Sequence, residues 1–188
     1  MLKYEIVILI TFLLFGCRLN SDNQKKKEIE KVVETWHGKQ IIFPDSIFIL
    51  EKEILYPVEV NPLNSGKLKL LTLVSGDCMS CIENLNKWSH FLDSLRSFSD
   101  IKLVVIIITS DLDRFIKDFY PLINDDFTLY IDVAFNFLIT YQMPEDLTLR
   151  TFLLDKTNKV LLIGNPIYRN EIKRLYINKI IEYEKKNI

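Results

Sequence analysis

Two cysteines separated by two residues are the part of this sequence best suited to chemistry. Cys78 and Cys81 lie in the stretch Ser-Gly-Asp-Cys-Met-Ser-Cys-Ile, residues 75–82, between a strand-like run and a helix-like run. At a helix N-terminus, backbone N–H groups would favour the thiolate form of Cys78. Cys81 would follow one helical turn later, close enough to form a disulfide with Cys78. The spacing therefore predicts a pair that cycles between dithiol and disulfide with little backbone movement.

The segments around this pair predict an α/β domain. A strand over 68–74 would precede the cysteines, and a helix over 82–98 would follow them, because its apolar residues recur at three- and four-residue steps. The near-continuous apolar run 101–109 is typical of a central strand that is covered on both faces. Ser110 or Asp111 is then expected to cap the next helix.

The remaining segments complete the expected fold. Residues 41–50 and 54–60 are rich in β-forming residues and are interrupted by prolines, which predicts a hairpin added at the edge of the sheet. Later elements are expected to be a helix over 112–120, strands over 127–131, 148–154 and 159–163, a short helix over 135–141, and a final amphipathic helix from Asn170 with Ile172, Leu175, Tyr176, Ile180 and Tyr183 on one face.

From residue 68 onward the chain resembles the thioredoxin fold, which begins with a strand, a Cys-x-x-Cys turn and a helix. Residues 151–155 (Thr-Phe-Leu-Leu-Asp), with 159–164 after them and 132–141 before them, are similar to the final hairpin of membrane-tethered, extracytoplasmic thiol–disulfide oxidoreductases of the TlpA/ResA type. The resemblance implies a thioredoxin fold with a central mixed sheet, helices on both faces and an N-terminal β-hairpin extension. It also implies catalysis by Cys78 and Cys81 without a cofactor.

Three positions differ from this group of enzymes. Asp77 stands where they usually carry a tryptophan, and Leu149, after Thr148, stands where they carry a cis-proline. A non-proline cis bond costs about 3 kcal/mol, so the Thr148–Leu149 bond is expected to be trans. Thr72 falls near the place of their buried acid, and a hydroxyl cannot shuttle a carboxyl proton. The residues expected around the cysteines are Asp77, Met79, Ser80, Thr148 and Leu149.

The first residues resemble a bacterial lipoprotein signal. Lys3 precedes an apolar run over 6–15, which is shorter than the roughly 20 residues of a membrane span and fits a signal-peptide core. The run ends in Leu-Phe-Gly-Cys, similar to a lipobox, whose cysteine (here Cys17) is lipidated. The alternative is a buried N-terminal strand or a short anchor. The expected organisation is a signal peptide over 1–16, a tether with a short helix over 17–40, and a thioredoxin-like domain over 41–188, divided into an extension over 41–66 and a core over 67–188.

This organisation predicts a protein on the extracytoplasmic side of the bacterial cell envelope. Lipid on Cys17 would hold the chain on the membrane without a spanning helix, in a compartment where disulfides persist. Lipidation would also leave Cys78 and Cys81 as the only pair among three cysteines. The implied partners are envelope proteins that carry thiols or disulfides. A net charge of −1 without a basic stripe argues against a nucleic-acid partner.

Three kinds of chemistry remain open for the pair, and we favour the first. In an oxidoreductase, Cys78 would be the more exposed cysteine and would attack a substrate disulfide, and Cys81 would resolve the mixed disulfide. The charge of Asp77 would oppose thiolate formation and make the pair more reducing. In a binding lipoprotein the disulfide would be only structural, which Asp77 and the missing proline favour. In a metal carrier the two thiolates would hold Cu(I) or Zn(II), although the motif places no third Cys, His or Met.

Overall fold

A computed structural model describes residues 23–59, 61–64, 66–97, 99–123 and 127–186. The chain divides into two units after Trp36. In the first unit, residues 23–36 form a helix. The second unit contains the sheet and the cysteine pair. None of the described helices combines the length and the apolar character that crossing a bilayer requires. The predicted signal peptide and Cys17 lie outside the described residues.

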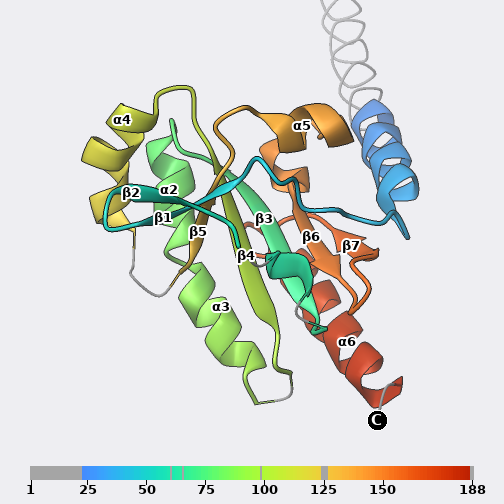
Figure 1. Ribbon diagram of the computed structural model, residues 1–188. Helices are drawn as coiled ribbons and strands as arrows, with labels where there is room; N and C mark the ends of the chain where they lie inside the picture. Colours follow the sequence, from blue (N-terminus) through green and yellow to red (C-terminus); the bar gives the residue numbers. More distant parts are fainter. Residues whose placement is uncertain (1–22, 60, 65, 98, 124–126, 187–188) are drawn as a thin grey trace, which may run out of the picture. The chain divides into compact units, whose positions relative to one another are not determined.

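Within the described residues, seven strands of the second unit form one sheet in the order β2-β1-β5-β4-β3-β6-β7 (Figure 1). β3 pairs in parallel with β4, and β4 with β5, whereas the other neighbouring pairs are antiparallel. The strands are β1 Phe48–Glu51, β2 Ile54–Pro57, β3 Lys69–Ser75, β4 Lys102–Ile108, β5 Leu129–Ile131, β6 Thr151–Leu154 and β7 Val160–Ile163. The predicted mixed sheet is confirmed, and the β1–β2 hairpin lies at its edge as predicted.

The helices follow the strands in the predicted order. They are α2 Met79–Leu85, α3 Trp88–Leu95, α4 Leu112–Arg114, α5 Asn136–Tyr141 and α6 Asn170–Lys186, with short 3-10 turns at Pro62–Asn64, Tyr120–Leu122 and Leu147–Leu149. α4 continues directly into a π-helical turn over Phe115–Phe119. Of the two residues proposed as its cap, Asp111 is the one used, because its carboxylate accepts the N–H of Arg114 at 3.0 Å.

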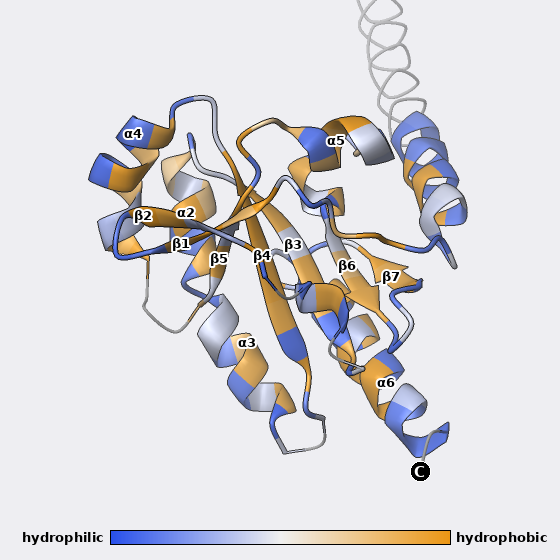
Figure 2. Cartoon of the chain, in the orientation of Figure 1, coloured by the Kyte–Doolittle hydropathy of each residue, from blue (hydrophilic) through white to orange (hydrophobic). Residues whose placement is uncertain are grey.

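Helices cover both faces of the sheet, as predicted. Alternate residues of a strand face opposite sides. Leu70 and Val74 of β3 belong to a core cluster that also contains buried residues of α2, α3, the π-helical turn and α6. On the opposite face, Tyr130 of β5 packs edge-on against Phe43 with ring centres 5.3 Å apart, and α5 buries Phe137. The central strands β3 and β4 are accordingly hydrophobic along most of their length (Figure 2).

The single helix predicted over 82–98 is instead two helices, α2 and α3. At the break, the N–H of Lys87 donates to the carbonyl of Asn84 at 3.1 Å, a tighter turn than an α-helix makes. The side-chain amide of Asn86 donates to the carbonyl of Leu122 at 2.7 Å. Leu85 and Trp88 are buried on either side of the break. The helical spacing of apolar residues therefore continues across the break and does not reveal it.

The predicted buried face of α6 is correct at Tyr176 and Ile180 and wrong at Leu175. Tyr176 and Ile180 are fully buried, whereas Leu175 is 54% exposed. The hydroxyl of Tyr176 donates to the carbonyl of Thr151 at 3.2 Å, which fixes the rotation of the helix. Because successive helical residues point about 100° apart, this rotation turns Leu175 away from the sheet.

Candidate functional site

The cysteine pair lies where β3 ends and α2 begins, and Cys78 and Cys81 form a disulfide with Cα atoms 5.2 Å apart. Cys78 is the N-cap of α2 in an extended conformation, with φ −129° and ψ 109°. Its carbonyl accepts the N–H groups of Cys81 and Ile82 at 3.0 and 3.2 Å. We call residues 76–81 the redox turn. The structure thus brings together the two sulfur atoms that the spacing predicted.

Gly76 allows the redox turn to pass tightly against the end of β4. Its N–H donates to the carbonyl of Ile108 at 2.8 Å. A Cβ atom on Gly76 would lie 2.8 Å from Cδ2 of Phe115 and 3.0 Å from both Cγ2 of Ile107 and Cβ of Thr109. These distances are shorter than carbon atoms tolerate, so the position of the turn depends on the missing side chain.

The two cysteines are both half-buried, so exposure does not separate their roles, but their neighbours differ. Sγ of Cys78 lies 3.3 Å from the hydroxyl of Ser80. Cys81 packs against the hydrophobic core. Met79, between them, is 48% exposed. Cys78 therefore has a potential hydrogen-bond donor for a thiolate, whereas Cys81 has apolar surroundings.

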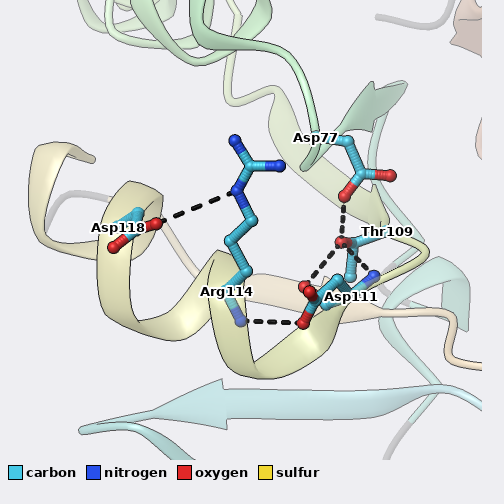
Figure 3. Close-up of polar contacts among 5 residues, drawn as sticks. All are labelled: Asp77, Thr109, Asp111, Arg114 and Asp118. Atoms are coloured by element: carbon cyan, nitrogen blue, oxygen red, sulfur yellow. Dashed lines mark hydrogen bonds and ion pairs between the residues drawn. The ribbon is translucent and has the colours of Figure 1, made fainter.

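Asp77 is an exposed residue whose carboxylate is bound by the segment after β4 (Figure 3). Its Oδ1 accepts the hydroxyl of Thr109 at 2.5 Å, and its Oδ2 accepts both the N–H and the hydroxyl of Ser110 at 2.9 Å. Burial acts to raise the pKa of Asp77. The hydrogen bonds and the positive charge of Arg114 outweigh burial, and hold that pKa below its ordinary value.

The segment before β6 differs from the prediction. The strand expected over 148–154 begins only at Thr151, because Asp146 caps a 3-10 turn instead. Oδ1 of Asp146 accepts the N–H of Thr148 at 2.9 Å, and its carbonyl accepts the N–H of Leu149 at 3.0 Å. The described residues contain no cis peptide bond, so the Thr148–Leu149 bond is trans as predicted.

A buried pair of hydroxyls lies at Thr72, the position that the sequence comparison placed near the buried acid of thioredoxin-type enzymes. Thr72 of β3 is buried, and its Oγ1 lies 2.9 Å from Oγ1 of Thr151 on the neighbouring strand β6. One hydrogen bond joins the two hydroxyls, so each of these buried oxygen atoms has a partner. The expectation that Thr72 offers no carboxyl proton is consistent with this geometry.

Two cavities lie beside the redox turn, and Leu147 lines both of them. The smaller cavity is lined by Cys81 together with Trp88 and Tyr168. The larger, of about 230 Å³, is lined by Asp77 and by mainly apolar side chains, among them Ile108, Phe135, Leu138 and Leu147. The predicted neighbours Thr148 and Leu149 line neither cavity.

Three exposed apolar side chains lie near the cysteines, and we call them the rim. Met79 stands between Cys78 and Cys81 in the sequence, and Leu147 and Tyr168 line the smaller cavity together with Cys81. These side chains are 48%, 40% and 41% exposed. Sequence reasoning included Met79 and missed Leu147 and Tyr168. The available signal for Leu147 was its place two residues before Leu149, the position compared with the cis-proline. Tyr168 follows β7 in the connection to α6, and no local pattern connects it to the cysteines.

A capped helix fixes the far wall of the larger cavity. Asp132, which follows β5, is fully buried, and its carboxylate accepts the N–H of Asn136 at 3.0 Å and of Phe137 at 2.7 Å. This carboxylate satisfies two N–H groups of the first turn of α5. Leu138 on this helix and Phe135, which directly precedes it, both line the cavity.

The structure does not reach every candidate residue. Cys17 lies outside the described residues, and the lipid anchor stays a prediction. In the part of the chain that is described, no three His, Cys, Asp or Glu side chains gather as they would to hold a metal ion.

Comparison with known proteins identifies the fold. No protein-family model matches the chain, and no curated protein matches it. An uncharacterized thioredoxin-like protein from Porphyromonas gingivalis is similar in structure, with 13% identity, a TM-score of 0.54, and coverage of 78% of this chain and 94% of that one. A candidate protein disulfide isomerase from Bacteroides thetaiotaomicron has 17% identity, a TM-score of 0.56, and coverage of 79% and 90%. A reduced 2-Cys peroxiredoxin from Plasmodium vivax has 21% identity, a TM-score of 0.54, and coverage of 80% and 99%. The predicted thioredoxin-like fold is confirmed.

Proposed function

We propose that this chain exchanges thiols and disulfides on other proteins through Cys78 and Cys81. The observation that carries the proposal is a disulfide at a strand–helix junction with the exposed apolar side chains of the rim beside it. A disulfide that only stabilised the fold would need no such rim. Exposed apolar side chains around a reactive group are suited to binding polypeptide.

The exchange uses the two sulfur atoms in turn. The Cys78 thiolate attacks one sulfur of a substrate disulfide, a mixed disulfide forms, and the second substrate sulfur leaves as a thiolate. The Cys81 thiolate then attacks Sγ of Cys78, closes the internal disulfide and releases the first substrate sulfur. Two electrons pass to the substrate, and the reverse sequence oxidises a substrate dithiol. The Ser80 hydroxyl, 3.3 Å from Sγ of Cys78, supports the choice of Cys78 as the attacking thiolate.

The proposed rim can be tested with an exposed leucine elsewhere as the control. Leu147→Asp is expected to raise the KM for insulin reduction about tenfold, because it places a charge where an apolar substrate side chain would lie. Reaction of the pair with a small thiol should stay the same, since a small thiol does not need the rim. Leu175 is an exposed leucine on α6. Leu175→Asp should change neither the KM for insulin nor the reaction with a small thiol. Equal losses in both variants would contradict a role for the rim.

The proposed location of the protein is the bacterial cell envelope, where lipid on Cys17 would hold the chain on a membrane. The sequence supports this through the apolar run over 6–15 and the Gly-Cys that ends it. Envelope proteins that carry thiols or disulfides are the proposed substrates, because disulfides persist outside the cytoplasm.

Replacement of Cys17 tests the anchor. Cys17→Ser is expected to abolish incorporation of a labelled fatty acid, and either to release the protein from the membrane fraction or to leave the precursor unprocessed. The comparison is the Cys78→Ser variant, which removes a cysteine but not the proposed lipid attachment site. If labelling persists in Cys17→Ser, the lipoprotein proposal fails.

A second candidate function is that of a binding lipoprotein with a structural disulfide. The observation that favours it is the paired backbone before β6. The N–H groups of Thr148 and Leu149 are bound within the 3-10 turn, and the carbonyl of Thr148 accepts the N–H of Asn165 at 2.8 Å. Little backbone is left there to pair with a substrate strand. Under this alternative, wild-type protein would not reduce insulin at all, and its disulfide would resist strong reductant.

A further inference from the structure

Building on the proposed function, we propose that Asp77 is a positioning residue: its carboxylate latches the redox turn onto the end of β4 and thereby favours the disulfide over the dithiol. We call Asp77 and its partners Thr109 and Ser110 the latch. The latch reaches the cysteines through the backbone, because Asp77 directly precedes Cys78.

Independent contacts hold the turn and the end of β4 together. The N–H of Gly76 donates to the carbonyl of Ile108 at 2.8 Å. One residue later, both carboxylate oxygens of Asp77 accept hydrogen bonds, Oδ1 from Thr109 and Oδ2 from the N–H and hydroxyl of Ser110. The absent side chain of Gly76 lets the two segments approach, since a Cβ would meet Thr109 at 3.0 Å. The carboxylate thus closes a contact that the backbone and the glycine have prepared.

Thr109, one of the two residues that bind Asp77 in the latch, is itself held in place. The Thr109 side chain is buried, and its Oγ1 also accepts the N–H of Asp111 at 3.2 Å. Asp111 caps α4 through the N–H of Arg114 (Figure 3). The donors therefore belong to an ordered helix start, so binding them ties the redox turn to that helix start.

The geometry argues against the alternative role of proton acceptor. A carboxylate that accepts three hydrogen bonds is stabilised in its ionised form. Asp77 has a depressed pKa for this reason, which makes it a weak base for a cysteine thiol. Its oxygens are engaged by residues 109–110 and not by either sulfur.

A fixed turn favours the disulfide because closing the bond then costs less conformational freedom. The relevant equilibrium is the reaction of the Cys78–Cys81 dithiol with glutathione disulfide, which gives the internal disulfide and two glutathione thiols. The protein loses two electrons, and glutathione disulfide gains them. Loosening the turn should lower the equilibrium constant for oxidation, whether or not the chain acts on protein substrates.

The experiment measures this equilibrium constant at pH 7 in the full-length chain, by alkylation and mass spectrometry of the peptide that contains both cysteines. Thr109→Val removes one donor to Asp77 and leaves the charge of Asp77 in place. We expect the equilibrium constant to fall roughly fivefold, the effect of one ordinary hydrogen bond. Ser110→Ala should shift it in the same direction. Thr157→Val is the matched control, because Thr157 Oγ1 donates to Asp155 at 2.8 Å in the β6–β7 connection.

The sign of the change separates the latch from simple charge repulsion. If Asp77 acted only through its charge, removing a donor would leave that charge less neutralised. The Cys78 thiolate would then be disfavoured, and oxidation of the pair would be unchanged or more favourable. If the two residues act as a unit, the equilibrium constant for oxidation should fall no further in the double variant Asp77→Asn/Thr109→Val than in Asp77→Asn alone. An unchanged or increased constant in Thr109→Val, or full additivity, would overturn the latch.

Failure of the latch and failure of the proposed function can be distinguished. A wild-type chain that fails to reduce insulin, but shows the fall in Thr109→Val, would refute the protein-exchange proposal and uphold the latch. A chain that reduces insulin normally, but whose equilibrium constant for oxidation does not fall in Thr109→Val, would uphold the protein-exchange proposal and refute the latch.

Discussion

The Cys81→Ser variant is expected to accumulate substrate proteins as mixed disulfides on Cys78, whereas Cys78→Ser should trap almost none. Without Cys81, no second thiolate is present to attack Sγ of Cys78, so the mixed disulfide persists. Without Cys78, the remaining thiol packs against the core. Insulin reduction should fall about 10³-fold or more in both variants, since removal of a covalent nucleophile or its partner usually costs at least that much.

The measurement is non-reducing electrophoresis of the tagged variants, recovered from cells after acid quenching, with reduction of the same sample as the control. Bands that disappear on reduction are the trapped partners. Double replacement of Cys78 and Cys81 should yield no such bands. Equal trapping by both single variants would show that the assigned order of attack is wrong.

Gly76→Ala is expected to destabilise the domain by about 2 kcal/mol, or roughly 4–8 °C in Tm, because inserting a methyl group into a packed site forces its neighbours apart. The new Cβ would meet Phe115, Ile107 and Thr109 at 3.0 Å or less. Two of these neighbours, Phe115 and Ile107, are fully buried and cannot turn away. Redox activity should fall too, because the displaced backbone carries Cys78.

Thermal and urea unfolding of Gly76→Ala would be compared with Gly66→Asn. Gly66 has a φ of 65°, and a Cβ atom placed on it would have nothing within 4 Å. Asparagine tolerates that backbone conformation, so Gly66→Asn should change the free energy of unfolding little. Phe115→Leu should make Gly76→Ala less costly than the sum of the two single changes, as expected for residues that share space. Strict additivity would place the clash elsewhere.

The central sheet could be predicted from the sequence because its strands are long apolar runs. β3 and β4 differ by only a residue or so at each end from the predicted 68–74 and 101–109. The break between α2 and α3 could not be predicted in this way. It depends on an amide of Asn86 meeting the carbonyl of Leu122, 36 residues away in the chain.

The site was only partly predictable for the same reason. The spacing of Cys78 and Cys81 is local and identified the pair, but Asp77 and Thr109 are 32 residues apart. They meet because β3 and β4 are parallel neighbours, whose carboxyl ends lie at the same edge of the sheet. The sequence places both residues just after apolar runs, so this contact had a detectable signal. The 3-10 turn at Leu147–Leu149 had no comparable signal, because the β-forming residues after it favoured the prediction of a strand.

The residues of the rim come from three separate places in the chain, two of them connections, and this has a consequence for divergence among related chains. Met79 begins α2, Leu147 precedes β6, and Tyr168 lies between β7 and α6. The cysteines, in contrast, sit at the end of β3, which is bonded on both sides. Connections tolerate substitution and insertion far better than central strands do. If the proposed function holds, related chains can therefore come to bind different polypeptides by altering single loops, while the cysteine pair and its supporting sheet stay the same.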